Sequence, residues 1–198
     1  KTKEIKKWLV SRKREIPVII QQMKFSELDQ WSFELETGNL KHESGKFFSI
    51  IGFDVQTNWG PIDHWTQPII KQPEIGFLGI ITKKSDGKIY CLMQAKIEPG
   101  NLNYVQLSPT IQATKSNYTR VHKGKKSLYL EYFRDRNNFV LIDQLQSEQG
   151  GRFFKKRNRN IIIEPKDEIP VYESFQWMAL DQIVQLLRID NTVNMDTR

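Results

Sequence analysis

Four segments of this 198-residue chain combine charged and amide side chains with small or aromatic residues, a mixture that ordinary loops of a sheet protein lack. They are residues 44–48 (SGKFF), 94–101 (QAKIEPGN), 106–124 (QLSPTIQATKSNYTRVHKG) and 147–160 (SEQGGRFFKKRNRN). A polar side chain that is buried without a partner costs several kcal/mol. We therefore expect these segments to meet a polar ligand, water or one another.

In the second segment Gln94, Lys96 and Glu98 alternate with two apolar residues. Side chains two positions apart on a strand point to the same face, so a strand would place all three together. Complementary side chains for this face are available downstream, at Gln106, Gln112 and Arg120. The alternative is an ordinary solvated face of a sheet.

The fourth segment is strongly basic. Planar guanidinium groups bind diphosphate oxygens in pairs, and a neighbouring aromatic ring can stack on a base. The segment therefore predicts a site for a nucleotide diphosphate, with a basic turn between strands or a single-stranded RNA site as alternatives. Its basic residues, which surround Phe153 and Phe154, are Arg152, Lys155, Lys156, Arg157 and Arg159.

The net charge of +7 is concentrated at the N-terminus, where residues 1–24 hold eight Lys or Arg against two Glu. The rest of the chain is almost neutral, so the charge does not favour a nucleic-acid partner. No apolar run is long enough to span a bilayer, and a lone cysteine, Cys91, lies in an apolar run. These features predict a cytoplasmic protein with no membrane partner and with Cys91 packed in a strand.

The sequence predicts neither a metal site nor a phosphate-binding loop. His42, His64 and His122 do not stand at ligand spacing, so no metal site is predicted. The chain also lacks a dinucleotide-binding fingerprint, a Walker sequence and a nucleophile elbow.

The elements that must position these segments are predicted to form an α+β fold, a mixed and largely antiparallel sheet flanked by helices. Residues 1–30 are expected to be a peripheral helical arm divided by Pro17, with a single domain over residues 31–198. The stripe Leu180, Ile183, Val184 and Leu187 predicts a final helix packed on the sheet. Strands are expected at 47–58, 75–82, 88–95, 104–107, 127–133, 139–141 and 161–164, with a tight turn at 85–87.

Taken together, the four segments, Trp65-Thr66-Gln67-Pro68 and the terminal NMDTR of 194–198 resemble the sugar-nucleotide 2,3-dehydratase family. The resemblance runs from about Trp31 to Arg198. It implies a Nudix-like fold without the Nudix metal box, and two related repeats in the usual member, of which this chain resembles the first. A homodimer, or a second repeat, is the implied partner.

The resemblance implies an enzyme that removes water across carbons 2 and 3 of a nucleotide-linked 4-keto-6-deoxyhexose, dTDP-4-keto-6-deoxy-D-glucose, without a cofactor. The hydrogen on carbon 3 is acidic because it adjoins the carbonyl, so the reaction needs a base, an acid and donors to the enolate oxygen. A non-catalytic nucleotide-sugar-binding module, or half-enzyme, is the alternative.

Within the matched segments, His122 and Glu148 are the predicted proton-handling pair, with Tyr118 in reserve, because environment can tune imidazole and carboxyl pKa values towards neutrality. The alternative for each is a hydrogen-bonding role in the scaffold. The predicted substrate-binding residues are Lys96, Glu98, Gln106, Gln112, Arg120, Arg152, Lys156, Arg157, Arg159 and Trp65.

Overall fold

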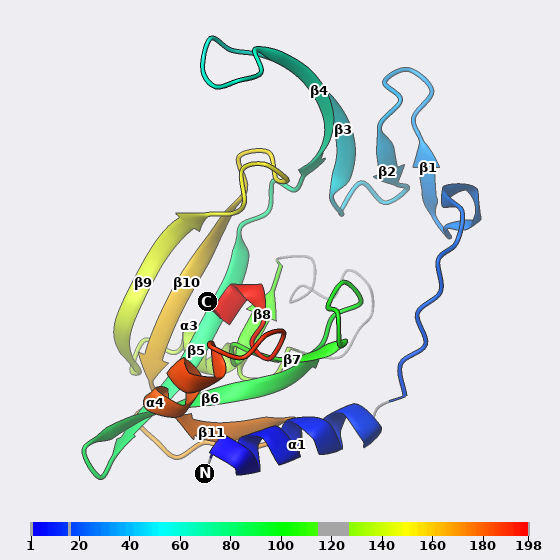
Figure 1. The fold of residues 1–198 in the computed structure, drawn as a ribbon. Coiled ribbons are helices and arrows are strands. Elements are labelled where there is room, and N and C mark those ends of the chain that lie inside the picture. The colour runs from blue at the N-terminus through cyan, green and yellow to red at the C-terminus, as the bar shows by residue number, and fades with distance from the viewer. Residues whose placement is uncertain (1, 16, 115–126, 198) are drawn as a thin grey trace.

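The computed structural model describes residues 2–15, 17–114 and 127–197. In it the chain folds into two β-sheets with few helices (Figure 1). The larger sheet has the strand order β11-β6-β5-β10-β9, with β7 paired to β6 and β8 paired to β5. Within it β5 and β10 run parallel, and the other pairs are antiparallel. Its strands are β5 (Gly76–Ser85), β6 (Lys88–Ile97), β7 (Val105–Ser108), β8 (Ile111–Ala113), β9 (Phe139–Ser147), β10 (Arg157–Glu164) and β11 (Phe175–Ala179).

The smaller sheet is an antiparallel meander that projects from the body, at the top of Figure 1. The loop after β9 joins it to the body, since Ile70 N donates to Arg152 O and Phe154 N donates to Ile70 O, each over 2.8 Å. The Phe53 and Phe154 rings, 4.8 Å apart, pack across the same junction. The strands of the smaller sheet are β1 (Trp31–Phe33), β2 (Leu40–His42), β3 (Ser49–Gln56) and β4 (His64–Lys71).

The helical elements are α1 (Thr2–Glu15), α3 (Leu130–Arg134), α4 (Leu180–Leu186) and the 3₁₀ turns η1 (Phe25–Glu27) and η2 (Met195–Thr197). These elements and the two sheets confirm the predicted α+β class and the mixed, largely antiparallel pairing. None of the helices in the described parts of the chain is both long and apolar enough to cross a bilayer.

The hairpin β5–β6 follows from its turn chemistry. Asp86 and Gly87 both have positive φ, at 49° and 70°. Two such residues form the turn whose twist matches that of the flanking strands, and Ser85 pairs with Lys88 across it. This confirms the predicted hairpin, and Cys91 is buried in β6 as expected. Burial raises the pKa of the Cys91 thiol to about 11, which keeps it unreactive.

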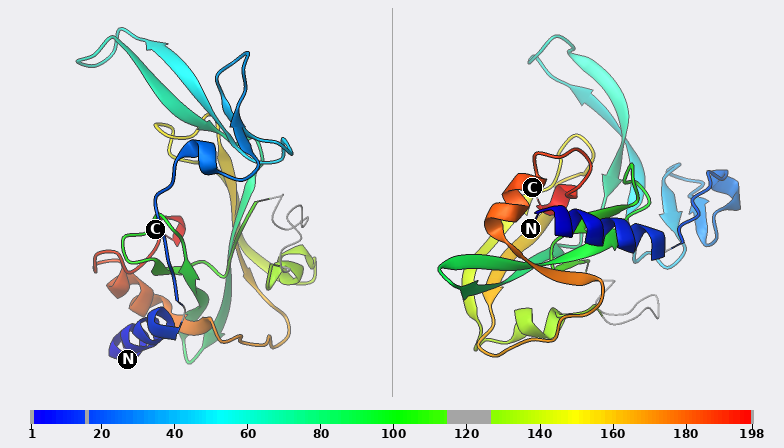
Figure 2. Two further views of the ribbon diagram at one scale, coloured as in Figure 1. Left: turned by 90° about the vertical axis from the view of Figure 1, so that its right-hand side faces the viewer. Right: turned by 60° about the horizontal axis from the view of Figure 1, so that its bottom comes forward.

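Two buried clusters cover opposite faces of the larger sheet. One joins β6 and β7 to α1 and α4, and includes Ile5 and Leu9. The other joins β5, β10 and β11 to α3, and includes Phe133. Helix α1 therefore packs on the body, in contact with β7 and α4 (Figure 2). The chain has no helix between Pro17 and Lys24, where one was predicted.

Two further element predictions are corrected. Residues 127–133 were expected to be a strand, but Leu130–Arg134 is helix α3, entered through Tyr129 at a positive φ of 64°. Leu130 and Phe133, three positions apart, are both buried by this turn. In α4 the buried side chains are Ile183 and Leu186, whereas Leu180, Val184 and Leu187 of the predicted stripe are exposed.

Candidate active site

A polar cleft opens where the larger sheet divides. Strand β5 pairs with β6 from Ile81 onward but with β8 over Phe77–Gly79, so β6 and β7 leave the plane of β5. Two adjoining hollows of about 270 Å³ and 180 Å³ lie here and share Leu78, Glu148, Asn158 and Asp196. We call these hollows together the polar cleft; it is also lined by Lys96, Gln112, Lys156, Asn160 and Gln149.

The end of β6 supplies a carboxylate held by amide and ammonium donors. Lys96 Nζ (3.2 Å) and Gln112 Nε2 (2.8 Å) donate to Glu98 Oε1, while Asn101 Nδ2 (3.1 Å) and Asn194 Nδ2 (3.3 Å) donate to Oε2. Burial alone would raise the pKa of Glu98, but the charge of Lys96 and these donors outweigh it and lower the pKa. Glu98 is therefore an ionised anchor for the cleft wall.

These contacts confirm that Lys96 and Glu98 share one face and that Gln112 complements it. Gln106, predicted for the same group, lies opposite Lys96 in the β6–β7 pair. Directly opposed residues of antiparallel strands project to the same face, so Gln106 is beside Lys96. Its side chain is buried, with 6% of its surface exposed.

The turn between β9 and β10 presents Glu148 to the cleft. Asn158 Nδ2 donates to Glu148 Oε2 over 2.5 Å, and the backbone N–H of Gln149 donates to Glu148 Oε1 over 3.1 Å. Asn158 pairs with Gly76 on the neighbouring strand β5, where a glycine leaves room for its side chain, because a Cβ on Gly76 would collide with Asn158 Oδ1. Glu148 is half-buried, so its carboxylate is oriented by neighbours and still borders open space.

Lys156 places a second ammonium group at the cleft. It is 6% exposed, and its Nζ donates to the carbonyl oxygen of Glu74. Burial lowers the pKa of Lys156, and the charges of Glu74 and Glu148 partly offset this. A buried ammonium next to open space is a donor that an anionic oxygen could use.

Asp196 is the functional candidate that sequence reasoning missed. It lies on η2, which follows the isolated bridge between Val193 and Leu107. Burial, and then the charges of Glu148 and Glu98, raise the pKa of Asp196 to about 6, with Lys96 opposing. The terminal NMDTR string contributed to the family resemblance, and the carboxyl within it was the available signal.

Of the predicted arginines, Arg152, Arg157 and Arg159 lie in the described part of the chain, and none of them lines the polar cleft. Arg157 and Arg159 are exposed on β10, where they alternate with the buried Asn158. Arg159 makes a bidentate pair with Asp143, with distances of 2.7 Å and 2.5 Å, and its guanidinium lies 5.7 Å from the ring centre of Phe77. Adjacent residues of a strand point to opposite faces, so Arg159 faces away from Asn158.

Trp65 and Arg152 lie at the junction of the two sheets. Trp65 Nε1 donates to Gln67 Oε1 over 2.8 Å, and Gln67 Nε2 donates to Gly151 O over 3.1 Å. Trp65 and Arg152 are both exposed. Tyr118, Arg120 and His122 lie outside the described residues.

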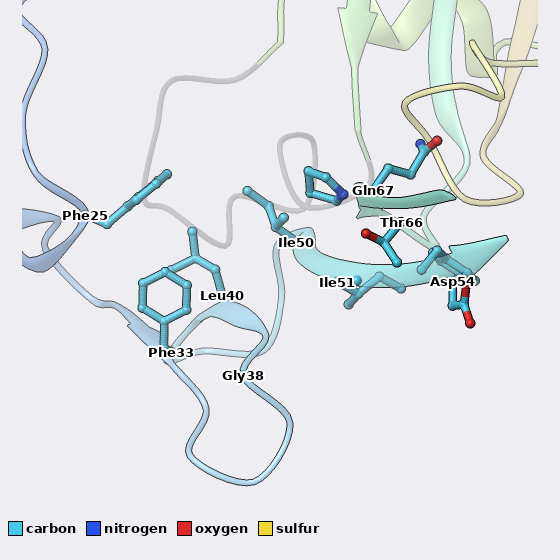
Figure 3. Close-up of a pocket in the computed structure, with 12 residues that line it drawn as sticks. Phe25, Phe33, Gly38, Leu40, Ile50, Ile51, Asp54, Thr66 and Gln67 are labelled. Atoms are coloured by element: carbon cyan, nitrogen blue, oxygen red, sulfur yellow. The ribbon is translucent and has the colours of Figure 1, made fainter. Parts of the chain in front are cut away.

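A larger hollow of about 720 Å³ lies on the smaller sheet (Figure 3). Apolar side chains such as Phe25, Phe33, Leu40 and Ile50 dominate it, and Asp54 is its one charged residue. A single carboxylate, 2.5 Å from His64 Nε2, offers less acid–base chemistry than the polar cleft does. We therefore take the polar cleft as the candidate active site. Among residues 2–15, 17–114 and 127–197, no group of three or more His, Cys, Asp or Glu could hold a metal ion.

The sequence pattern of the NDP-hexose 2,3-dehydratase family matches residues 2–198. The chain belongs to this family. Among curated members, it is 50% identical over 198 residues to the dTDP-4-dehydro-6-deoxy-alpha-D-glucopyranose 2,3-dehydratase of Saccharopolyspora spinosa. The proteins of the same name from Amycolatopsis orientalis and Streptomyces violaceoruber are 46% and 47% identical, over 204 and 195 residues.

These alignments cover 96–100% of the chain but only 41–44% of each relative. The chain thus spans less than half the length of the 2,3-dehydratases it matches. The family resemblance expected from the sequence is confirmed.

Proposed function

We propose that this chain removes water across carbons 2 and 3 of dTDP-4-keto-6-deoxy-D-glucose, the sugar nucleotide that its relatives' names describe. One observation carries the proposal: in a member of the 2,3-dehydratase family, two carboxyl groups and two ammonium groups line one cleft. The polar cleft is lined by Glu148 and Asp196 together with Lys96 and Lys156. The proposed reaction needs no cofactor.

The chemistry begins at carbon 3, whose hydrogen adjoins the keto group. Glu148 is the proposed base, since its carboxylate is oriented by Asn158 and borders the hollow. Lys96 and Lys156 are the proposed donors to the developing enolate oxygen, where fixed charges lower the barrier most. His122 and Tyr118 stay predictions for the same proton transfers.

The proposal is tested by incubating the protein with dTDP-4-keto-6-deoxy-D-glucose and following the nucleotide sugar by mass. Loss of one water from the sugar is the expected result. The alternative, a module that only binds the nucleotide sugar, is favoured if the ligand binds but keeps its mass.

Diphosphate recognition is proposed for the loop before β10. We expect Arg152→Ala to weaken dTDP binding at least tenfold, about 1.4 kcal/mol, because the guanidinium is exposed and can grip phosphate oxygens in pairs. Isothermal titration with dTDP measures this.

Arg159→Ala is the matched control for that measurement. The Arg159 guanidinium is already paired with Asp143, so we expect Arg159→Ala to weaken dTDP binding less than Arg152→Ala does. The basic composition alone predicts weaker binding in both variants. Unchanged affinity in both variants would remove the basic segment from the binding site.

A second copy of this chain is the proposed partner of strand β9. All nine residues of β9 are exposed, Phe139, Val140 and Leu145 among them, and its single charged residue, Asp143, is paired with Arg159. Strand β9 ends the order of the larger sheet, so a symmetry-related β9 could add to its free edge.

We therefore expect sedimentation to show a dimer, and Leu145→Lys to give a monomer with an unchanged melting temperature. Ile19→Lys, at an exposed position away from the sheet edge, is the control and should stay dimeric. A monomeric wild-type protein at assay concentrations contradicts this partner. The Nudix-like fold and the cytoplasmic location remain proposals drawn from the family resemblance and the composition.

A further inference from the structure

We propose that Asp196 is the general acid that delivers a proton to the hydroxyl leaving carbon 2, while Glu148 removes the hydrogen from carbon 3. This inference rests on the dehydration proposed above and assigns its second proton transfer. Both carboxyl groups line both hollows of the polar cleft. They reach it from different parts of the chain, Glu148 from the turn after β9 and Asp196 from η2.

The segment that carries Asp196 is fixed at several points. Leu107 N donates to Thr192 O over 2.9 Å, and Asn194 N donates to Leu107 O over 2.8 Å. The Asn194 side chain, 2% exposed, contacts Glu98 and Gln112 and accepts a hydrogen bond from Thr197 Oγ1. Asp196 lies between these two anchored residues, so its position is set by the scaffold rather than by a ligand.

The surroundings of Asp196 make its carboxyl hold a proton more readily than an ordinary Asp does, because burial and neighbouring carboxylates raise its pKa to about 6. The charged groups that act on it are the carboxylates of Glu148 and Glu98 and the more weakly acting ammonium of Lys96. In the described parts of the chain, no side chain donates a hydrogen bond to its carboxylate, whereas Glu98 receives four. Glu148, by contrast, accepts hydrogen bonds from Asn158 Nδ2 and from the backbone N–H of Gln149, so the two carboxyl groups of one cleft have different surroundings that suit opposite roles.

The proposed step balances. Glu148 takes the carbon 3 proton, and the electron pair forms the enolate of the 4-keto group. The enolate then returns its electrons to form the carbon 2–carbon 3 double bond, the carbon 2–oxygen bond breaks, and the Asp196 proton leaves with that oxygen as water. The enol at carbon 3 tautomerises to a 3,4-diketone.

A substrate whose leaving group needs no proton distinguishes a proton-donating role of Asp196 from a structural one. We expect Asp196→Asn to lower elimination of water at least 100-fold while exchange of the carbon 3 hydrogen with deuterium oxide and dTDP affinity persist. The same variant should eliminate fluoride from the 2-deoxy-2-fluoro analogue within tenfold of the wild-type rate. Asp190→Asn, which removes an exposed carboxylate nearby in the sequence, is the control and should behave as wild type.

Near-normal water elimination by Asp196→Asn, loss of carbon 3 exchange, or failure of the fluoro analogue to restore the rate each overturns the proposal. If the variant does not fold, the wild-type pH profile decides: a required acid makes water loss fall as pH rises through its pKa, and fluoride loss should not fall. Parallel profiles overturn the assignment. Failure of the wild-type protein to exchange or eliminate would instead reject the dehydratase function itself.

Discussion

Replacing Glu148 by Gln is expected to lower turnover of dTDP-4-keto-6-deoxy-D-glucose by about 10²-fold or more, within the range typical of general acid–base assistance. The amide keeps the size of the side chain and can still accept the hydrogen bond from Asn158, but it cannot take up a proton. Initial rates at saturating substrate measure the loss. We expect dTDP affinity and the melting temperature to stay near wild type.

Glu36→Gln is the matched control, because Glu36 is an exposed carboxylate of the β1–β2 loop, remote in sequence from the cleft residues. Near-normal turnover in Glu148→Gln would contradict the proposed base. The search would then move to His122→Asn and Tyr118→Phe. A fall in stability alone would show that Glu148 is part of the scaffold.

Glu98→Gln is expected to destabilise the fold by about 1–3 kcal/mol at neutral pH, the usual cost of leaving buried donors unsatisfied. The carboxylate accepts from Lys96 and from three amide groups, and an amide would turn its own NH₂ towards two of these donors. Denaturant unfolding of wild type and variant measures the difference.

The pH dependence of that difference has a definite sign. The pKa of Glu98 is lowered in the folded state, so its contribution is complete above the unfolded value of about 4.3 and is lost as pH falls through the folded value. We expect the gap between wild type and Glu98→Gln to be full at neutral pH and to shrink below about pH 4. A gap that does not change with pH would show that the charge of Glu98 is irrelevant.

Local chemistry explains which elements could be predicted. The β5–β6 hairpin is encoded in two apolar runs around Asp86 and Gly87, a residue pair whose preference for this tight turn depends little on the rest of the fold. The segment around Leu130 is different, because its closely spaced apolar residues suit a strand as well as a short helix. The packing of Phe133 in the cluster with Phe77 decides in favour of the helix. The division into two sheets depends on pairings that no local pattern specifies.

The same distinction holds for the site. Lys96 and Glu98 could be grouped in advance because the two-residue period of a strand fixes their relative direction. Asp196 could not, since it reaches the cleft through the contact of Val193 with Leu107, residues far apart in the chain. The orientation of Arg159 also depended on a partner, Asp143, that composition did not reveal.

We infer that this chain itself performs the elimination in the polar cleft. A proton NMR time course in deuterium oxide, with dTDP-4-keto-6-deoxy-D-glucose and the wild-type protein, tests it most directly. We expect the carbon 3 hydrogen signal to disappear and deuterium to enter carbon 2 of the diketone product. Both changes should be much slower with the Glu148→Gln variant. A carbon 3 signal that persists in the presence of wild-type protein, while the thymidine signals show that the ligand is bound, would contradict it.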